Sequence, residues 1–221
     1  MGGRLVLLPG LGADADLLEP QRRAFPDLEV LPWLDPRPDE SLEEFGRRMA
    51  EASTLDGGSV IGGVSFGGMV ASVMARHVRP RALVLIASCT SGRAVRGYRR
   101  VLAPLLASFP WKRPLPRAAW PLVAWFFGAR APHHRKALYR LLAQAPIPFV
   151  QWGLSAIVRW SPATAASAAG TRVRHIHGTS DRLLPIRGVH PTDVVQGGGH
   201  FINVTHADQV NECVQRAREE G

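Results

Sequence analysis

The feature that most constrains this chain is an apolar run that ends in Gly-x-Ser-x-Gly and leads directly into a helix-forming segment. The run begins at Val60, Ser65 stands between Gly63 and Gly67, and the segment 69–75 is rich in alanine, valine and methionine. This order predicts a strand, a sharp strained turn that exposes the serine, and a helix. Glycines on both sides of the serine let the strand and the helix approach closely. A glycine-rich turn without chemistry fits the same five residues, so the rest of the chain must decide between the two interpretations.

The chain on both sides of this turn alternates between strand-like and helix-like segments. A capping box at Ser41 to Glu44 opens one helical pattern, and a closing helix is expected at 206–218. We predict strands at residues 5–8, 28–31, 60–64, 81–87, 172–177 and 193–196. The alternation predicts an α/β fold with an open, mostly parallel sheet of about six strands and helices on both faces.

Residues 91–162 interrupt the alternation. They contain no clear strand, many prolines, and five of the six tryptophans of the chain. Because proline is tolerated in first turns and breaks helix interiors, the prolines divide this segment into short helices. These are predicted at 96–108, 116–127, 133–143 and 149–159. We therefore expect 1–90 and 163–221 to form one core, with 91–162 as a helical insertion.

The positive charge of the chain belongs to the same insertion. The formal net charge is +9, and residues 91–160 hold twelve Arg or Lys and no Asp or Glu, whereas the remainder carries 15 basic and 18 acidic residues. Such asymmetry fits an anionic partner, such as nucleic acid, a membrane surface or a phosphorylated substrate, and it equally fits a solvated arginine-rich face.

Several functional classes lack support in the sequence. Cys89 and Cys213 fit neither a metal-ligand spacing nor a disulfide framework. The adjacent His133 and His134 do not face the same way on a helix, so we assign no metal and no cofactor. The first apolar run is too short for a signal peptide, and the window 118–127 is about half of the roughly 20 residues of a spanning helix. We expect a cytoplasmic protein without a transmembrane segment.

Three polar residues stand just past the ends of three predicted strands: Ser65, Asp181 and His200. The carboxyl ends of parallel strands meet at one edge of the sheet, where ligands bind. A serine nucleophile needs a base to take its proton and a carboxylate to hold that base in the right tautomer. Taken alone, Asp181 fits a turn or helix cap and His200 fits a loop histidine. Together, and in this order, the three residues predict a catalytic triad.

At these residues the sequence resembles the α/β-hydrolase superfamily, over nearly the whole chain outside 91–160. Residues 63–67 look like the nucleophile elbow of that family, residues 177–181 look like its acid turn, and residues 199–201 look like its histidine loop. The sequence departs from the family in lacking the strands that begin many members and in a short interval of 19 positions between Asp181 and His200. We interpret the chain as a trimmed form of the fold.

The resemblance also implies an oxyanion hole and a cap. It assigns the two hydrogen-bond donors to the backbone N–H groups of Leu11 and Phe66, with Gly10 and Gly12 allowing the loop to approach. It places 91–162 over the active-site edge as a helical cap whose large apolar side chains supply the pocket wall. The pocket candidates are Trp111, Trp125 and Trp152.

The leading hypothesis is a carboxylesterase or thioesterase that forms an acyl-enzyme on Ser65, with His200 as base and then acid, and Asp181 as its orienter. The substrate is a small-molecule ester or thioester that is apolar and, if the cap arginines reach it, anionic. One alternative is a cofactor-free lyase or C–C hydrolase with the same triad. Another is a non-catalytic protein whose basic cap docks on an anionic surface. A nucleic-acid partner is not expected, and the sequence leaves the oligomeric state open.

Overall fold

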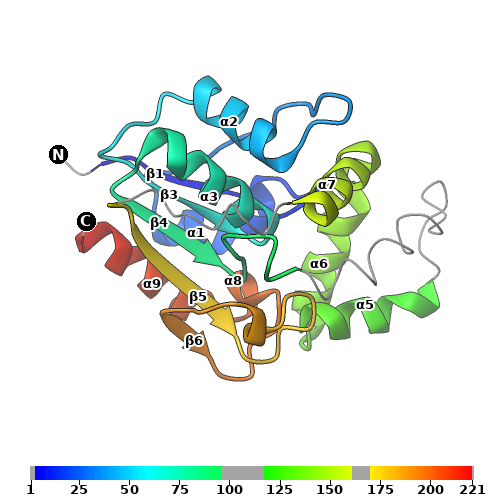
Figure 1. The fold of residues 1–221 in the computed structure, drawn as a ribbon. Helices are drawn as coiled ribbons and strands as arrows, with labels where there is room; N and C mark the ends of the chain where they lie inside the picture. The colour runs from blue at the N-terminus through cyan, green and yellow to red at the C-terminus, as the bar shows by residue number, and fades with distance from the viewer. Residues whose placement is uncertain (1–2, 96–116, 161–169, 221) are drawn as a thin grey trace.

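The computed structural model describes residues 3–95, 117–160 and 170–220, and the expected helix at 96–108 and Trp111 lie outside these ranges. Six strands form one sheet in the order β2-β1-β3-β4-β5-β6, and every neighbouring pair is parallel. The strands are β1 (Leu5–Leu8), β2 (Leu28–Val30), β3 (Val60–Val64), β4 (Ala82–Ile86), β5 (Arg172–Gly178) and β6 (Asp193–Val195). The predicted α/β fold with an open parallel sheet is thereby confirmed (Figure 1).

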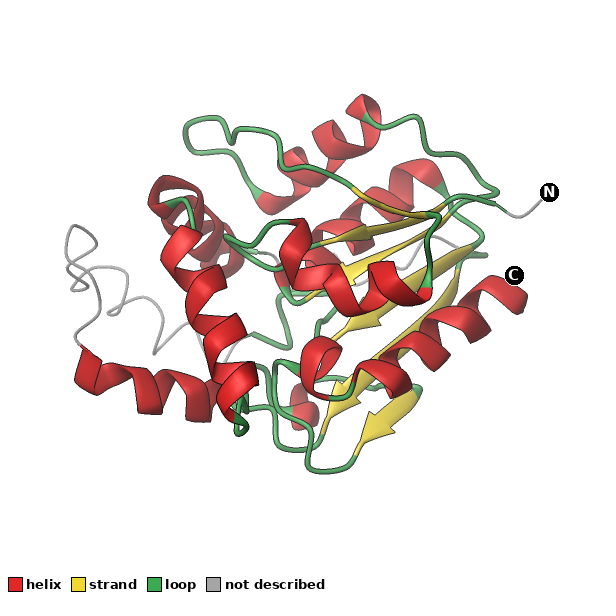
Figure 2. Ribbon diagram, turned by 180° about the vertical axis from the view of Figure 1, so that it is seen from behind, coloured by secondary structure: helices red, strands yellow, loops and turns green. Residues whose placement is uncertain are grey.

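Helices cover both faces of the sheet, as Figure 2 shows from behind. On one face, α2 (Leu42–Ala52) and α3 (Phe66–Val78) pack over side chains of β1, β3 and β4. On the other face lie η1 (Ala15–Leu18), α1 (Glu19–Ala24), α8 (Ile202–Thr205) and α9 (Ala207–Glu219). The strands β1, β3 and β4 are buried along their whole length, which explains why their sequences are continuous apolar runs.

The predicted capping box begins α2. Ser41 Oγ accepts a hydrogen bond from the backbone N–H of Glu44 at 3.2 Å, and the Glu44 carboxylate accepts one from the backbone N–H of Ser41 at 2.9 Å. The apolar stripe that follows, including Phe45 and Met49, faces the sheet and is buried. This helix therefore begins and orients itself as its sequence predicts.

The segment between β4 and β5 is helical in its described part. It contains η2 (Arg117–Ala119), α5 (Trp120–Phe127), α6 (Pro132–Gln144) and α7 (Ile147–Arg159), close to the predicted ranges. Each of the three α-helices has a proline at its first or second position, as expected for prolines that open helices. These helices lie beside the carboxyl ends of the strands (Figure 1).

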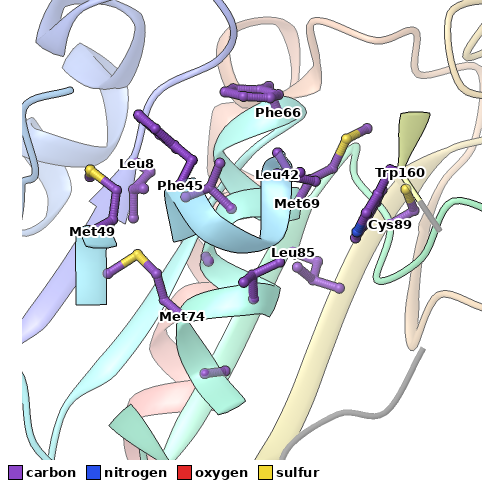
Figure 3. Close-up of a cluster of buried hydrophobic side chains, with 14 of the residues drawn as sticks. Leu8, Leu42, Phe45, Met49, Phe66, Met69, Met74, Leu85, Cys89 and Trp160 are labelled. Atoms are coloured by element: carbon purple, nitrogen blue, oxygen red, sulfur yellow. The ribbon is translucent and has the colours of Figure 1, made fainter. Parts of the chain in front are cut away.

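The helices α5 to α7 are joined to both halves of the core. Phe149 on α7 and Trp160 just after it belong to the cluster that also contains Phe45 and Met74, and Figure 3 shows Trp160 beside Cys89. Leu138 of α6 belongs to the cluster on the opposite face of the sheet. The described part of this segment is therefore held to both faces of the sheet by close apolar packing.

A search of the described residues for membrane-spanning helices found no single helix that is both long and apolar enough. Only α6 and α7 together meet the criteria of length and composition, and they are bent by 97° at the break between them.

Candidate active site

Ser65 occupies the sharp turn between β3 and α3. Its backbone has φ 53° and ψ −117°, a conformation that is sparsely populated for a residue with a side chain and that costs about 1–3 kcal/mol. The turn is possible because Gly67 has no side chain: a Cβ there would lie 2.2 Å from the carbonyl oxygen of Pro9. The strain predicted at Ser65 is thus present, and it is accommodated by backbone contact that only glycine permits.

Two hydrogen bonds hold the Ser65 backbone from β4 and the turn after it. The Ser65 N–H donates to the carbonyl of Ile86 at 2.9 Å, and the Ser88 hydroxyl donates to the Ser65 carbonyl at 2.6 Å. Ser88 is completely buried. The strained conformation is therefore fixed on both sides of the Ser65 side chain.

The structure brings Ser65, Asp181 and His200 together from the ends of β3, β5 and β6. Ser65 Oγ lies 2.8 Å from His200 Nε2, and His200 Nδ1 lies 2.7 Å from Asp181 Oδ2. The short interval between the acid and the histidine does not displace His200, because only the short 3-10 helix η4 (Ile186–Gly188) and β6 lie between them. With the Asp181 carboxylate as acceptor, Nδ1 of His200 carries the hydrogen and Nε2 faces the serine hydroxyl as an acceptor.

The Asp181 carboxylate is kept ionised although it is buried. Burial by itself raises the pKa of a carboxyl group. That effect is outweighed by the electrostatic attraction of His200, by hydrogen bonds from His177 and His200, and by a backbone hydrogen bond at Leu184, so the pKa of Asp181 lies well below its ordinary value. The backbone N–H groups of Leu183 and Leu184 donate to Oδ1 at 2.9 and 2.8 Å. Asp181 is thus a fixed negative charge behind His200.

The backbone groups expected to form an oxyanion hole lie at the same place. Phe66 is the first residue of α3, so its N–H belongs to the first turn, whose donors have no partner within the helix. Leu11 and Phe66 both line the cavity that Ser65 opens into. Of the supporting glycines, Gly10 lines that cavity as well, Gly12 has φ +71°, and Gly63 is buried in β3 against Gly67.

An apolar cavity of about 300 Å³ adjoins Ser65 and His200. Its other described lining residues are glycines and apolar side chains, and they come mainly from the loop after β1, from α3, and from α6 and α7. The helix α6 contributes Leu138, Leu141 and Leu142, and α7 contributes Val150 and Leu154. Apart from His200, no ionisable side chain is among these lining residues. The arrangement suits an uncharged, apolar group next to the serine.

Of the three tryptophans predicted to line the pocket, the two that the structure describes, Trp125 and Trp152, do not line it. Trp152 points to the other side of α7, where its indole N–H donates to the carbonyl of Glu40 at 3.0 Å and its ring packs on Phe45. Trp125 is 53% exposed and carries the guanidinium of Arg182 over its ring. The assignment of Trp125 and Trp152 to the pocket is therefore wrong, and leucines of α6 take that place. Their spacing at positions 138, 141 and 142 is a helical signal that the sequence already contained.

The basic residues of α6 and α7 point away from the cavity. Arg135, Lys136 and Arg140 on α6 and Arg159 on α7 are exposed. None of them is among the residues that line the cavity. The described structure therefore gives no cation to bind an anionic substrate beside Ser65. A search of the described residues for groups of three or more His, Cys, Asp or Glu able to hold a metal ion found none.

The chain matches the model of the alpha/beta hydrolase family over residues 5–213, and it belongs to that family. A comparison with curated protein sequences found no significant match.

Solved structures share the fold at low sequence identity. An esterase (EaEST) from Exiguobacterium antarcticum has a TM-score of 0.77 at 13% identity, covering 99% of this chain and 93% of the other. A bromoperoxidase from Bacillus anthracis has a TM-score of 0.72 at 17% identity, covering 98% and 92%. The NocB thioesterase domain, in covalent complex with a fluorophosphonate nocardicin G analog, has a TM-score of 0.57 at 20% identity, covering 98% and 95%. These likenesses establish the fold and leave the reaction to be argued from the site.

Proposed function

We propose that this chain is a serine hydrolase that cleaves a carboxylic ester or thioester with an apolar acyl group. The observation that carries the proposal is the continuous hydrogen-bonded series from Ser65 through His200 to Asp181, opening into an apolar cavity. The series contains a nucleophile, a base and an orienting carboxylate, which are the three parts that acyl transfer to a serine requires.

In the first half-reaction, Ser65 Oγ attacks the carbonyl carbon of the substrate while His200 Nε2 takes the hydroxyl proton. Asp181 accepts from Nδ1–H of His200 and stabilises the imidazolium that forms. The developing oxyanion would be met by the backbone N–H groups of Leu11 and Phe66. His200 then gives its proton to the departing alcohol or thiol, which leaves the acyl group on Ser65.

In the second half-reaction, water replaces the alcohol or thiol. His200 Nε2 takes a proton from water, the hydroxide attacks the acyl carbon, and Ser65 recovers its proton from His200 as the carboxylic acid departs. The strained backbone at Ser65 keeps the hydroxyl in reach of both His200 and the substrate, so the nucleophile is already oriented in the folded state.

The cavity supports an apolar acyl group over a charged one. Its described lining offers leucine, valine and alanine surface but no guanidinium or ammonium. A carboxylate placed there would lose its hydration without gaining a partner. Each methylene that enters such a surface contributes about 0.8 kcal/mol, or roughly a fourfold change in binding.

A panel of p-nitrophenyl esters and matching acyl thioesters, from acetyl to lauroyl, tests this substrate class. We expect kcat/KM to rise with chain length until the cavity is filled and then to fall. A hemisuccinate ester, which ends in a carboxylate, should be hydrolysed more slowly than the butyrate ester of similar length. Ser65→Ala is the control and should abolish turnover of every substrate. Equal rates for all acyl groups, or a preference for hemisuccinate, would contradict the apolar assignment.

A further inference from the structure

Three buried polar residues near the triad have no part in the mechanism described above. Ser88 follows β4, and His175 and His177 lie on β5; their side chains are 0%, 5% and 0% exposed. The two histidines are separated by one residue and therefore lie on the same face of the strand. Buried polar groups destabilise the folded state unless they are hydrogen-bonded, so the hydrogen-bond partners of these three residues indicate their role.

His177 contacts the triad directly, at Asp181. Its Nε2 lies 2.7 Å from the carbonyl oxygen of Leu184 and 3.3 Å from Asp181 Oδ2. Both oxygens are acceptors only, because Asp181 is ionised, so Nε2 of His177 carries the hydrogen and donates. Asp181 Oδ2 is the same oxygen that accepts from His200 at 2.7 Å. One carboxylate oxygen is thus shared by two histidines.

The other nitrogen of His177 is fixed by His175. His175 Nε2 lies 3.1 Å from His177 Nδ1, with the two rings almost perpendicular at 84°. Burial, and then electrostatic repulsion by His177, lower the pKa of His175 to about 3, so His175 is neutral near pH 7. A neutral ring in this place orients His177 by one hydrogen bond.

At its other end, the histidine pair is linked to the backbone of Ser65. The His175 side chain has a hydrogen bond with the backbone of Ser88. The Ser88 hydroxyl in turn donates to the Ser65 carbonyl at 2.6 Å. Ala87, just before Ser88, has φ +46°, which is unusual for a residue with a side chain. A buried polar series therefore runs from the Ser65 backbone through Ser88, His175 and His177 to Asp181. Ser88 and the two histidines are not among the residues that line the cavity.

We propose that His177 is a positioning residue for the triad: oriented by His175, it holds Asp181 Oδ2 in place and competes with His200 for its negative charge. This inference rests on the proposed function. It gives His177 two separate effects. The first is geometric, because the carboxylate oxygen that orients His200 is held by a second donor. The second is electrostatic, because each donor to Oδ2 weakens the pull of Asp181 on a proton at His200.

The electrostatic effect predicts a direction for the pH profile. The ionisable groups that act on the pair are Asp181 and His200 on one side, and His190 and Asp193 beyond His175 on the other. If the donor at position 177 is removed, the Asp181 charge is less neutralised and stabilises protonated His200 more strongly. The base is then lost at a higher pH, so the acid limb of the kcat/KM profile moves upward.

The test compares His177→Phe, which keeps a ring but removes both nitrogens, with His177→Gln, whose amide nitrogen can still donate to Leu184 and Asp181. We expect His177→Phe to lower kcat by about tenfold to a hundredfold, the size of a small misplacement of a catalytic group, with KM nearly unchanged. Its acid limb should move to higher pH. His177→Gln should stay within a few-fold of the parent, with an unmoved limb.

A stability control separates positioning from a loss of packing. Gln21 is fully buried and its amide donates to the carbonyl of Asn203 at 2.9 Å. Gln21→Met removes a buried donor elsewhere, so it should lower the thermal midpoint without moving the acid limb. Thermal melts of all three variants show whether any of them is unfolded at the assay temperature.

A spectroscopic readout keeps the test independent of turnover. The hydrogen between His200 and Asp181 should give a far-downfield proton resonance, and this resonance should shift in His177→Phe and not in His177→Gln. If the parent hydrolyses esters and His177→Phe retains its kcat, acid limb and resonance, the proposed function stands and the positioning role is wrong. If no ester is turned over, the proposed function fails, and the resonance alone decides the role of His177. An equal loss in His177→Gln and His177→Phe would also overturn the proposal.

Discussion

The strand edge that carries Ser65 and the helices α5 to α7 lie on two sides of one cavity, and different forces hold them. At the strand edge, hydrogen bonds of 2.6 to 2.8 Å fix Ser65, Asp181 and His200, and glycine backbones touch where no side chain fits. On the helical side, leucines and valines face the cavity and the charges are exposed. Directional bonds allow few substitutions, whereas apolar packing tolerates exchanges of similar volume. The strand edge is therefore expected to determine whether the reaction occurs, and the helical side is expected to determine which substrates react.

The largest expected effect comes from the strand edge. In Asp181→Asn the amide cannot offer His200 a negative charge, and its NH₂ group favours the wrong tautomer of the imidazole. We expect kcat on a p-nitrophenyl ester to fall by about 10⁴-fold, as for the loss of the carboxylate in other triads. Circular dichroism should show an unchanged fold, since the side chain keeps its shape. Near-normal turnover would place the orienting acid elsewhere and would contradict the claim that the strand edge determines whether the reaction occurs.

A smaller and selective effect is expected on the helical side. Leu142→Phe adds volume to the α6 wall of the cavity and should lower kcat/KM for long acyl chains by about tenfold, within the cost of overpacking a fitted site. The acetate ester should be nearly unaffected. The matched control is Leu122→Phe on α5, where the parent side chain is 58% exposed and does not line the cavity. A uniform loss over all chain lengths in Leu142→Phe, or the same selectivity change in Leu122→Phe, would show that the cavity does not hold the acyl group.

The fold was predictable from the sequence because its signals are local and repeated. Runs such as 60–64 and 82–86 are apolar throughout because their strands are buried on both faces, and the Ser41 capping box marks a helix start without reference to the rest of the chain. The meeting of Ser65, Asp181 and His200 followed from topology, since each residue comes after the end of a parallel strand.

The cavity wall was less predictable because it depends on how each helix is rotated. Trp152 and Leu154 are two residues apart on α7, so they point in different directions, and only the packing of α7 on Phe45 decides which one faces the cavity. Composition favoured the tryptophan, and tertiary contacts placed the leucine there instead.

The role proposed for His177 also escaped the sequence, although a signal was present. Its alternation with Ile176 places His175 and His177 together on one face of β5, four residues before Asp181 in the case of His177. Two histidines on one face of a buried strand are unusual in a protein core, and they indicate a charged hydrogen-bond partner. Which oxygen they would meet could be known only from the folded turn at Asp181.

The central claim is that Ser65 is a nucleophile activated by its surroundings, and labelling with a fluorophosphonate probe tests it most directly. The phosphorus should be attacked by Ser65 Oγ with loss of fluoride, so mass spectrometry of the digested protein should find the adduct on the peptide that contains Ser65. Folded Ser65→Ala should remain unlabelled under the same conditions. A parent protein that is folded and takes no label, or a label that persists in Ser65→Ala, would contradict the account and favour a fold that binds without catalysing.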